Sequence, residues 1–295
     1  MLTEDDLETP SPRRWGLPLL LFLATCATTF LSGGTNWRPF LLFVDLEQTM
    51  RALSHYWPQG LVYMAAVIGI LLTHEMGHFL QAVRYGVPAS YPLFLPFPVW
   101  ITGTMGAVIV MEGSQADRKQ LFDIGISGPL AGLVVAIPIL IWAILTGVPA
   151  PPRDAMIGEH LNDPLIITLL IRWLRPELAP GTELFFSPLL IAGWVGMLIT
   201  GLNMMPISQL DGGHVIYGLF GKGAHFVARG FVCAVVAAML YFDSYNWIVM
   251  FTLVLFLGID HPPTRNDAVK LGPLRTVIGW LSLLIPVFCF TPVPM

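Results

Sequence analysis

The chain has 295 residues, of which 55% are hydrophobic and only 12% are charged, and its net charge is −4. A soluble domain carries about 25% charged residues, so an ordinary soluble globule is excluded. A disordered chain is excluded as well, because such chains are polar and highly charged. No basic tract is present, so we expect no nucleic-acid partner. The composition indicates a protein embedded in a lipid bilayer.

Stretches of mostly apolar residues recur along the chain, and about 20 such residues form a helix that crosses a bilayer. We expect seven of them, at residues 16–33, 59–83, 121–146, 185–205, 224–241, 246–259 and 272–290. The first follows an acidic segment and no clean cleavage site follows it, which argues against a signal peptide. The sixth is short enough to be tilted or partly inserted. The predicted fold class is an all-α, polytopic membrane protein with six to seven transmembrane helices.

The segment between the second and third spans has a different character. Residues 88–111 are apolar but contain four prolines, which forbid a continuous helix: Pro88, Pro92, Pro96 and Pro98. Glycines and then β-branched residues follow at 103–111, which suits a strand. Unpaired backbone cannot face lipid, so we expect a small β-hairpin or re-entrant sheet embedded among the helices. A plain surface loop is the alternative.

The longest polar connection, residues 147–184, is too short for a full soluble domain and predicts an amphipathic helix around 166–174. The distribution of Lys and Arg predicts the orientation. With seven spans and the N-terminus in the cytoplasm, ten of the 15 Lys and Arg residues fall on the cytoplasmic side. We therefore expect a multi-pass protein of the cell (inner) membrane, with its N-terminus and active site towards the cytoplasm.

The strongest motif is the HExxH sequence at residues 74–78, inside the second expected span. His74 and His78 are i and i+4, so they share one face of a helix. Both imidazoles can then reach one zinc ion, while Glu75 handles the proton of a water molecule. Packed histidines with a helix-end glutamate are the alternative, but three ionisable groups inside a membrane helix are costly without partners. The motif predicts one Zn²⁺ per chain.

A catalytic zinc site usually has three protein ligands, and Asp211 is the best candidate for the third. It follows the fourth span, which ends on the same side as the second span, so the two elements meet at one depth. The alternative for Asp211-Gly-Gly is a simple turn. Asn203 can hydrogen-bond a developing oxyanion or cap a broken helix end. His214 is expected to donate a hydrogen bond to one of the zinc ligands. The alternative is that it binds the zinc ion as a fourth ligand.

Other polar residues have simpler expected roles. Asp123 is expected to cap the third span, and the small residues after it allow helices to approach closely: Gly125, Ser127, Gly128, Ala131 and Gly132. His225 is expected at the membrane interface. The segment His261-Pro-Pro-Thr264 is expected to form a rigid cytoplasmic turn, with a functional role as the alternative. The three cysteines are far apart in sequence and form no metal pair or disulfide framework.

The HExxH helix and the distant NxxPxxxLDG segment resemble the site-2 protease family of intramembrane zinc metalloproteases. The residues in pattern are Asn203, Pro206, Leu210, Asp211 and Gly212. The resemblance implies zinc ligation by His74, His78 and Asp211, with Glu75 as general base and Asn203 near the scissile carbonyl. It covers residues 59–214, and we divide the chain into an N-terminal segment (1–58), a catalytic core (59–223) and C-terminal helices (224–295).

The predicted activity is hydrolysis of peptide bonds in or near transmembrane segments of membrane-anchored proteins. A helical substrate must be unwound first, and a strand edge at Gly103, Thr104, Met105 and Gly106 is expected to bind it in extended form. A membrane metal transporter or metal sensor is the alternative, as is a scaffold with a structural metal. The sequence leaves the substrate and the oligomeric state open.

Overall fold

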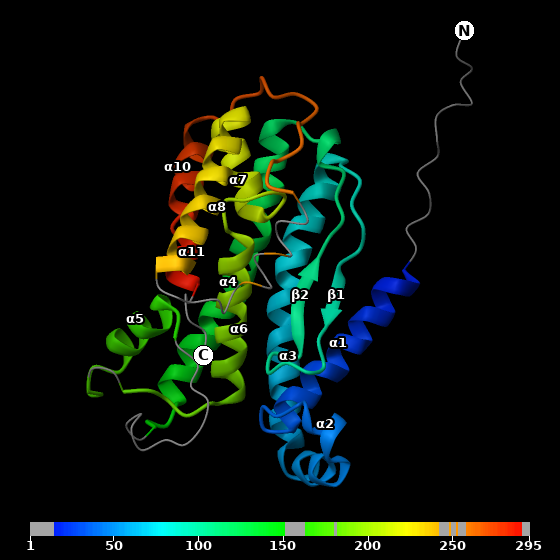
Figure 1. The fold of residues 1–295 in the computed structure, drawn as a ribbon, viewed down its shortest axis with the longest axis vertical. Helices are drawn as coiled ribbons and strands as arrows, with labels where there is room; N and C mark the ends of the chain where they lie inside the picture. The colour runs from blue at the N-terminus through cyan, green and yellow to red at the C-terminus, as the bar shows by residue number, and fades with distance from the viewer. Residues whose placement is uncertain are drawn as a thin grey trace.

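Helices make up most of the molecule, and a two-stranded sheet packs against them (Figure 1). The computed structural model describes residues 15–150, 163–179, 182–241, 248, 252 and 258–290. The sixth expected span, 246–259, therefore lies almost wholly outside the described residues.

Four stretches of described helix are long and apolar enough to cross a bilayer. They are α1 (Gly16–Gly34), α3 (Leu46–Tyr85), α4 (Arg118–Thr146) and the stretch Asp211–Tyr241. A left-handed backbone at Gly221, with φ of 57°, divides this last stretch into α7 (Asp211–Phe220), the 3-10 turn η4 (Gly221–Gly223) and α8 (Ala224–Tyr241). The mostly helical membrane fold is confirmed, whereas the predicted count of six to seven spans is not.

Shorter helices complete the described part of the chain. They are α2 (Leu41–Val44), the 3-10 turn η2 (Gly113–Gln115), α5 (Leu165–Leu174), α6 (Pro188–Asn203), α10 (Pro273–Ser282) and α11 (Ile285–Cys289). The predicted span at 185–205 is occupied by α6, and that at 272–290 by α10 and α11. The predicted amphipathic helix around 166–174 is confirmed as α5.

The helix with the HExxH motif, α3, begins well before the predicted start of its span at residue 59. Asp45 caps it by accepting a hydrogen bond from the Gln48 backbone N–H at 2.9 Å. Pro58 lies inside it and removes a single backbone donor without ending the helix. The helix stops at Gly86, whose φ of 66° suits a glycine at a helix end.

The start of α4 corrects the expected role of Asp123. Asp117 caps this helix, and its side chain and that of Gln120 form a reciprocal capping box. Asp123 instead lies in the second turn and accepts hydrogen bonds from Arg275 at 2.7 and 3.0 Å and from the Tyr85 hydroxyl at 2.5 Å. It therefore ties α3, α4 and α10 together.

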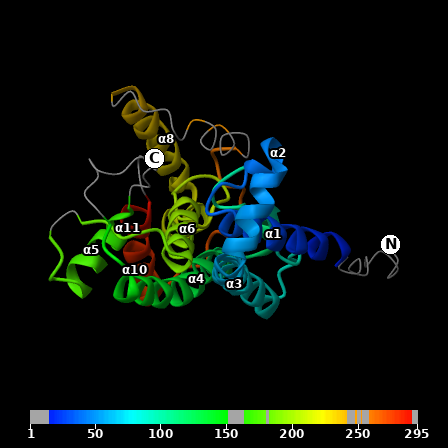
Figure 2. The same ribbon diagram turned by 90° about the horizontal axis from the view of Figure 1, so that it is seen from below.

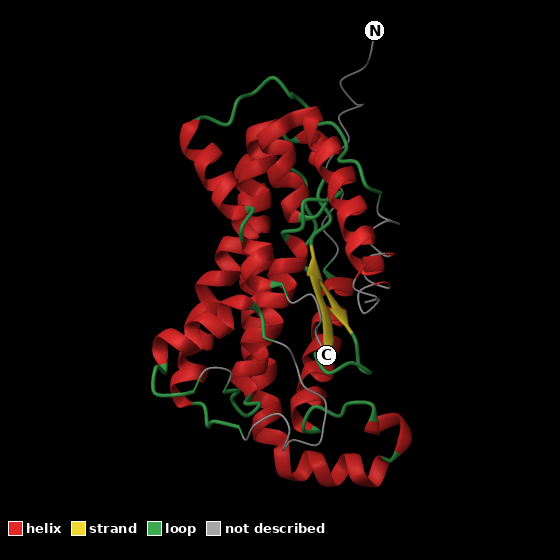
Figure 3. Cartoon of the chain, turned by 60° about the vertical axis from the view of Figure 1, so that its left-hand side comes forward, coloured by secondary structure: helices red, strands yellow, loops and turns green. Residues whose placement is uncertain are grey.

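The expected β-hairpin is present. Strands β1 (Leu93–Pro96) and β2 (Thr104–Val108) are antiparallel, with Leu93 opposite Val108 and a bulge between Phe94 and Pro96. Figure 3 shows the two strands standing beside the helices. The Tyr63 hydroxyl of α3 donates to the Thr102 carbonyl at 2.8 Å, and Ser32 of α1 donates to the Ile101 carbonyl. The turn between the strands is thus attached to two helices.

The HExxH motif lies among closely packed helices. Figure 2 shows α3, α4 and α6 in the middle, with α1 on one flank and α5, α10 and α11 on the other. A Cβ atom on Gly193 of α6 would lie 2.3 Å from the Leu140 side chain of α4, so a larger residue there would force that side chain or the helix to move. Between α1 and α3, a Cβ on Gly60 would lie 2.7 Å from the Phe30 carbonyl oxygen.

Candidate metal centre

The HExxH motif lies on a buried part of α3. His74, Glu75 and His78 are 2%, 3% and 5% exposed, respectively. One turn of helix separates the two histidines, and their ring centroids are 5.0 Å apart. Their imidazoles point to one side of the helix, as the i, i+4 spacing predicts.

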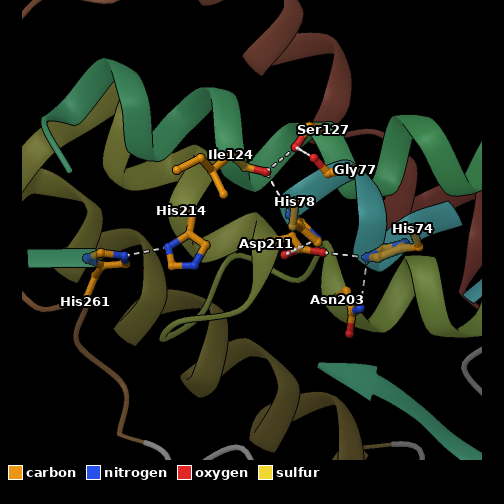
Figure 4. A network of polar contacts seen from close by, with 9 residues as sticks. All are labelled: His74, Gly77, His78, Ile124, Ser127, Asn203, Asp211, His214 and His261. Atoms are coloured by element: carbon orange, nitrogen blue, oxygen red, sulfur yellow. Dashed lines mark hydrogen bonds and ion pairs between the residues drawn. The ribbon is translucent and has the colours of Figure 1, made fainter. Parts of the chain in front are cut away.

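Asp211, the first residue of α7, meets both histidines (Figure 4). Its Oδ2 atom lies 3.1 Å from Nε2 of His74, and its Oδ1 atom lies 3.2 Å from Nε2 of His78. One ligand atom from each of these three residues lies within 4.8 Å of the others. The predicted ligands therefore come together although the chain between them is long.

The backbone of α4 fixes the orientation of His78. Its Nδ1–H donates to the Ile124 carbonyl at 2.7 Å, and the Ser127 hydroxyl is 2.7 Å from the same oxygen and 3.0 Å from the Gly77 carbonyl. A proton on Nδ1 leaves the lone pair of Nε2 facing Asp211, which is the form that binds a metal.

Glycines of α4, predicted to allow close approach of helices, also make room for the two imidazoles. A Cβ on Gly128 would lie 2.0 Å from Nε2 of His78, and one on Gly132 would lie 3.1 Å from Nδ1 of His74. A Cβ on Gly125 would lie 2.6 Å from the Cβ atom of His214. One face of α4 is thus hollowed to receive the histidines.

These residues fit a zinc ion. Two imidazole nitrogens and one carboxylate are the donor set of a catalytic zinc with three protein ligands. Their ligand atoms converge on one point, the ring of His78 is held by a second hydrogen bond, and Gly128 leaves space at its Nε2 atom. Only three His, Cys, Asp or Glu residues converge in this way within the described part of the chain.

A cavity of about 100 Å³ adjoins two of the three ligands, His78 and Asp211. Helices line one part of it and the segment that includes β2 lines the other: Glu75, His78, Ala107, Val108, Ile109, Met111, Ile124, Asn203, Gln209, Leu210, Asp211 and His214. Glu75 therefore faces the same small space as two of the ligands. A water molecule occupies about 30 Å³, so the cavity is large enough for a water molecule beside the Glu75 carboxylate.

Asn203 lies at the end of α6 and lines the cavity. Its Nδ2 atom is 3.4 Å from Nε2 of His74. The helix end at Met204 is capped by a backbone N–H, which contacts the Leu202 and Thr200 carbonyls. The amide group of Asn203 is thus directed to the three converging ligand residues through His74.

The four residues expected to bind substrate lie just before the strand residues that line the cavity. A Cβ on Gly103 would lie 2.6 Å from the Thr28 carbonyl, so this residue packs on α1. The Thr104 hydroxyl donates to the Leu95 carbonyl at 2.9 Å, and Met105 is exposed. Gly106 has φ of 105° and donates its N–H to the Thr104 hydroxyl at 3.0 Å.

His214 and His261 form a contact that the sequence did not predict. Nδ1 of His214 lies 2.7 Å from Nε2 of His261 (Figure 4). His261 is 6% exposed, and burial lowers the pKa of its imidazole to about 4, so the ring is neutral at neutral pH. Its neighbouring prolines indicated only a rigid turn. The participation of Ile124 and Ser127 in the site was missed too, because nothing local in sequence marks it.

Comparison with known proteins identifies the family. The model of peptidase family M50 matches residues 62–242. A rice (Oryza sativa subsp. japonica) protein named probable zinc metalloprotease EGY1, chloroplastic, is 31% identical over 243 residues, which is 76% of this chain and 42% of that protein. Its Arabidopsis thaliana counterpart is 31% identical over 233 residues, with 77% and 42% covered.

Probable zinc metalloprotease EGY2, chloroplastic, of Arabidopsis thaliana is 30% identical over 241 residues, covering 77% of this chain and 41% of that protein. The matched region thus spans less than half the length of these relatives. The HExxH helix, the three converging ligands and the match over residues 62–242 agree with one another. The chain belongs to peptidase family M50, the site-2 protease family of zinc metalloproteases.

Proposed function

We propose that this chain is an intramembrane protease that hydrolyses peptide bonds in or near transmembrane segments of membrane-anchored proteins, as in regulated intramembrane proteolysis. One observation carries the proposal: a metal-binding group and a buried carboxylate, Glu75, face one cavity among helices long enough to span a bilayer. In this proposal His74, His78 and Asp211 hold one zinc ion. The names of the relatives, probable zinc metalloproteases, support the reaction class.

A zinc ion held there supplies Lewis-acid chemistry, which polarises a carbonyl oxygen and makes water more acidic. Glu75 is the general base: its carboxylate takes a proton from the attacking water and passes it to the leaving amine. The water oxygen first bonds to the scissile carbonyl carbon, and the C–N bond then breaks as the leaving amine receives the proton from Glu75. Asn203 donates from Nδ2 to the carbonyl oxygen, where negative charge develops.

The substrate must be extended at the point of cleavage. An α-helix with side chains is about 10–12 Å in diameter, and the cavity of about 100 Å³ cannot admit it. Because residues 107–109 and Met111 line the cavity, an unwound substrate segment can lie along the hairpin and pair with it. Residues 103–106 are the proposed continuation of this binding strip.

The proposed partners are a transmembrane protein substrate and the bilayer. The side on which the site opens is proposed from the Lys and Arg distribution: it is the side of the N-terminus, which faces the cytoplasm in a cell membrane. The chloroplast location in the names of the relatives does not fit a cell inner membrane well. The proposed location is therefore a lipid bilayer, without assignment to a cellular compartment.

The test is cleavage of a single-span model substrate by the purified chain in detergent, comparing wild type with Glu75→Gln. We expect cleavage by wild type alone and one zinc ion per chain in both proteins. Glu47→Gln is the matched control, because Glu47 lies on the same helix and its side chain is 80% exposed. Equal cleavage by Glu75→Gln would contradict the assignment, and zinc flux into liposomes without any cleavage would favour a transporter.

A further inference from the structure

A chain of two hydrogen bonds runs from the loop before α10 to the cavity. Nδ1 of His261 lies 2.5 Å from the Pro262 carbonyl oxygen, and Nε2 of His261 lies 2.7 Å from Nδ1 of His214. His214 in turn lines the cavity beside Glu75 and Asp211. The loop is thus connected to the site through two imidazoles.

The positions of the protons in these two hydrogen bonds follow from the Pro262 carbonyl group. A carbonyl oxygen can only accept, so Nδ1 of His261 carries the proton that it donates to Pro262. The ring of His261 is neutral, and its Nε2 atom must therefore be an acceptor. Nδ1 of His214 then donates to it. If His214 is neutral, its Nε2 atom has no proton and presents a lone pair on the side away from His261.

The surrounding contacts hold His261 in this orientation. Its ring stacks on Tyr217, with centroids 4.5 Å apart and an angle of 29° between the planes. His225 donates from Nε2 to the His261 carbonyl at 3.1 Å. The loop is also attached to neighbouring segments by backbone bonds, from Ser208 to Ile259 at 3.1 Å and from Arg265 to Ala116 at 2.9 Å.

We infer that His261 is a positioning residue that holds His214 with its Nε2 lone pair towards the cavity, where it accepts a hydrogen bond from a backbone N–H of the extended substrate. The identity of the donor, a backbone N–H group of the substrate, rests on the proposed proteolytic function. The orientation and protonation of His214 do not depend on it. A peptide in extended form exposes N–H groups that need acceptors where protein covers them, and Nε2 of the half-buried His214 supplies one at the cavity.

Two variants of His261 separate this role from simple packing. His261→Phe keeps a ring against Tyr217 but removes both nitrogens, whereas His261→Gln offers an amide oxygen to the Nδ1–H group of His214. His55→Phe and His55→Gln are the matched controls, because His55 is exposed near the start of α3 and far from the site in sequence.

The first measurement is ¹H–¹⁵N NMR of histidine-labelled protein in detergent, with His214→Gln used to identify the signals of His214. We expect the Nδ1–H form of His214 in wild type and in His261→Gln, and its loss in His261→Phe, with zinc content unchanged in all three. An Nε2–H form of His214 in wild type would overturn the inference. An Nδ1–H form of His214 that persists unchanged in His261→Phe would also overturn it.

The second measurement is kcat/KM with a single-span substrate. Loss of a group that orients a site residue typically costs 10–100-fold, so we expect a fall of about this size in His261→Phe and recovery in His261→Gln. Loss of zinc in both variants would show a merely structural role and overturn the inference. If wild type cleaves no substrate, the proposed function fails, while the NMR result still decides whether His261 positions His214.

Discussion

Gly128 on α4 lies so close to His78 on α3 that a Cβ atom would be 2.0 Å from the Nε2 ligand atom. A single added methyl group therefore competes with the ligand itself. We predict that Gly128→Ala lowers the zinc content far below one ion per chain and abolishes cleavage, as measured by elemental analysis of the purified protein.

The control for this prediction is Gly69→Ala on α3. Nothing lies within 4 Å of a Cβ atom at Gly69, and alanine favours a helix over glycine by about 1 kcal/mol. This variant should keep its zinc and be at least as stable as wild type. Full zinc occupancy in Gly128→Ala would show that α3 and α4 can separate without loss of the site.

Asn203→Ala should separate metal binding from catalysis. The Nδ2 atom of Asn203 is directed to the metal group from the end of α6 and is not one of the three converging ligands. Removal of one donor to an oxyanion costs about 10²–10³ in kcat, so we expect a loss of this size with zinc retained. The measurement is kcat for a cleavable substrate, alongside zinc content.

Asn266→Ala is the matched control for Asn203→Ala, because the Asn266 side chain is exposed and bonds only the nearby Ala268 N–H among the contacts described. It should leave kcat unchanged. A rise in KM or a fall in zinc content in Asn203→Ala, with kcat unaffected, would assign Asn203 to binding and contradict its place near the carbonyl.

Arg275→Met should destabilise the fold, because it leaves the Asp123 carboxylate partly buried without its cation. Arg275 and Asp123 are bonded at 2.7 and 3.0 Å, and their side chains are 33% and 11% exposed. We expect a loss of about 1–3 kcal/mol, less than for a fully buried pair, measured as a lower midpoint of thermal unfolding in detergent.

The comparison for Arg275→Met is Arg229→Met, since Arg229 also pairs with an aspartate, Asp260. That pair is 59% and 41% exposed, and an exposed ion pair adds little stability because water screens the two charges. If the two variants lose equal stability, the link between α10 and the core does not depend on Asp123.

The substrate should be cleaved faster when its helix unwinds easily. The cavity is too small for a helix, and replacing alanine by glycine lowers the cost of unwinding by about 1 kcal/mol. A model substrate with glycine near the cleaved bond should therefore react roughly five-fold faster than one with alanine, as measured by kcat/KM at matched detergent concentration. Equal rates would show that unwinding does not limit the reaction.

Local patterns were enough to predict much of the site. His74 and His78 share a helical face because of their spacing, and Asp211 was placed beside them because two spans end on one side of the membrane. The structure brings these three together. The prolines at 88–98 and the strand pattern after them predicted the hairpin that the structure contains.

Other features depend on contacts between distant segments. The sequence could not show that Ile124 orients His78 or that His261 reaches His214. Nor could it show that residues 107–109 and Met111, rather than 103–106, line the cavity. The capping role expected for Asp123 was wrong. Asp117 caps α4 in a capping box with Gln120, and Asp123 instead binds Arg275.

The sequence by itself determined the membrane class, the shared helical face of His74 and His78, and the hairpin, because each follows from composition or from the pattern of one segment. Only the tertiary structure decided which backbone carbonyl holds His78, which glycine faces its Nε2 atom and which loop supports His214. Those contacts join residues about 50 positions apart in sequence and depend on how closely the helices pack, a property that no single helix encodes.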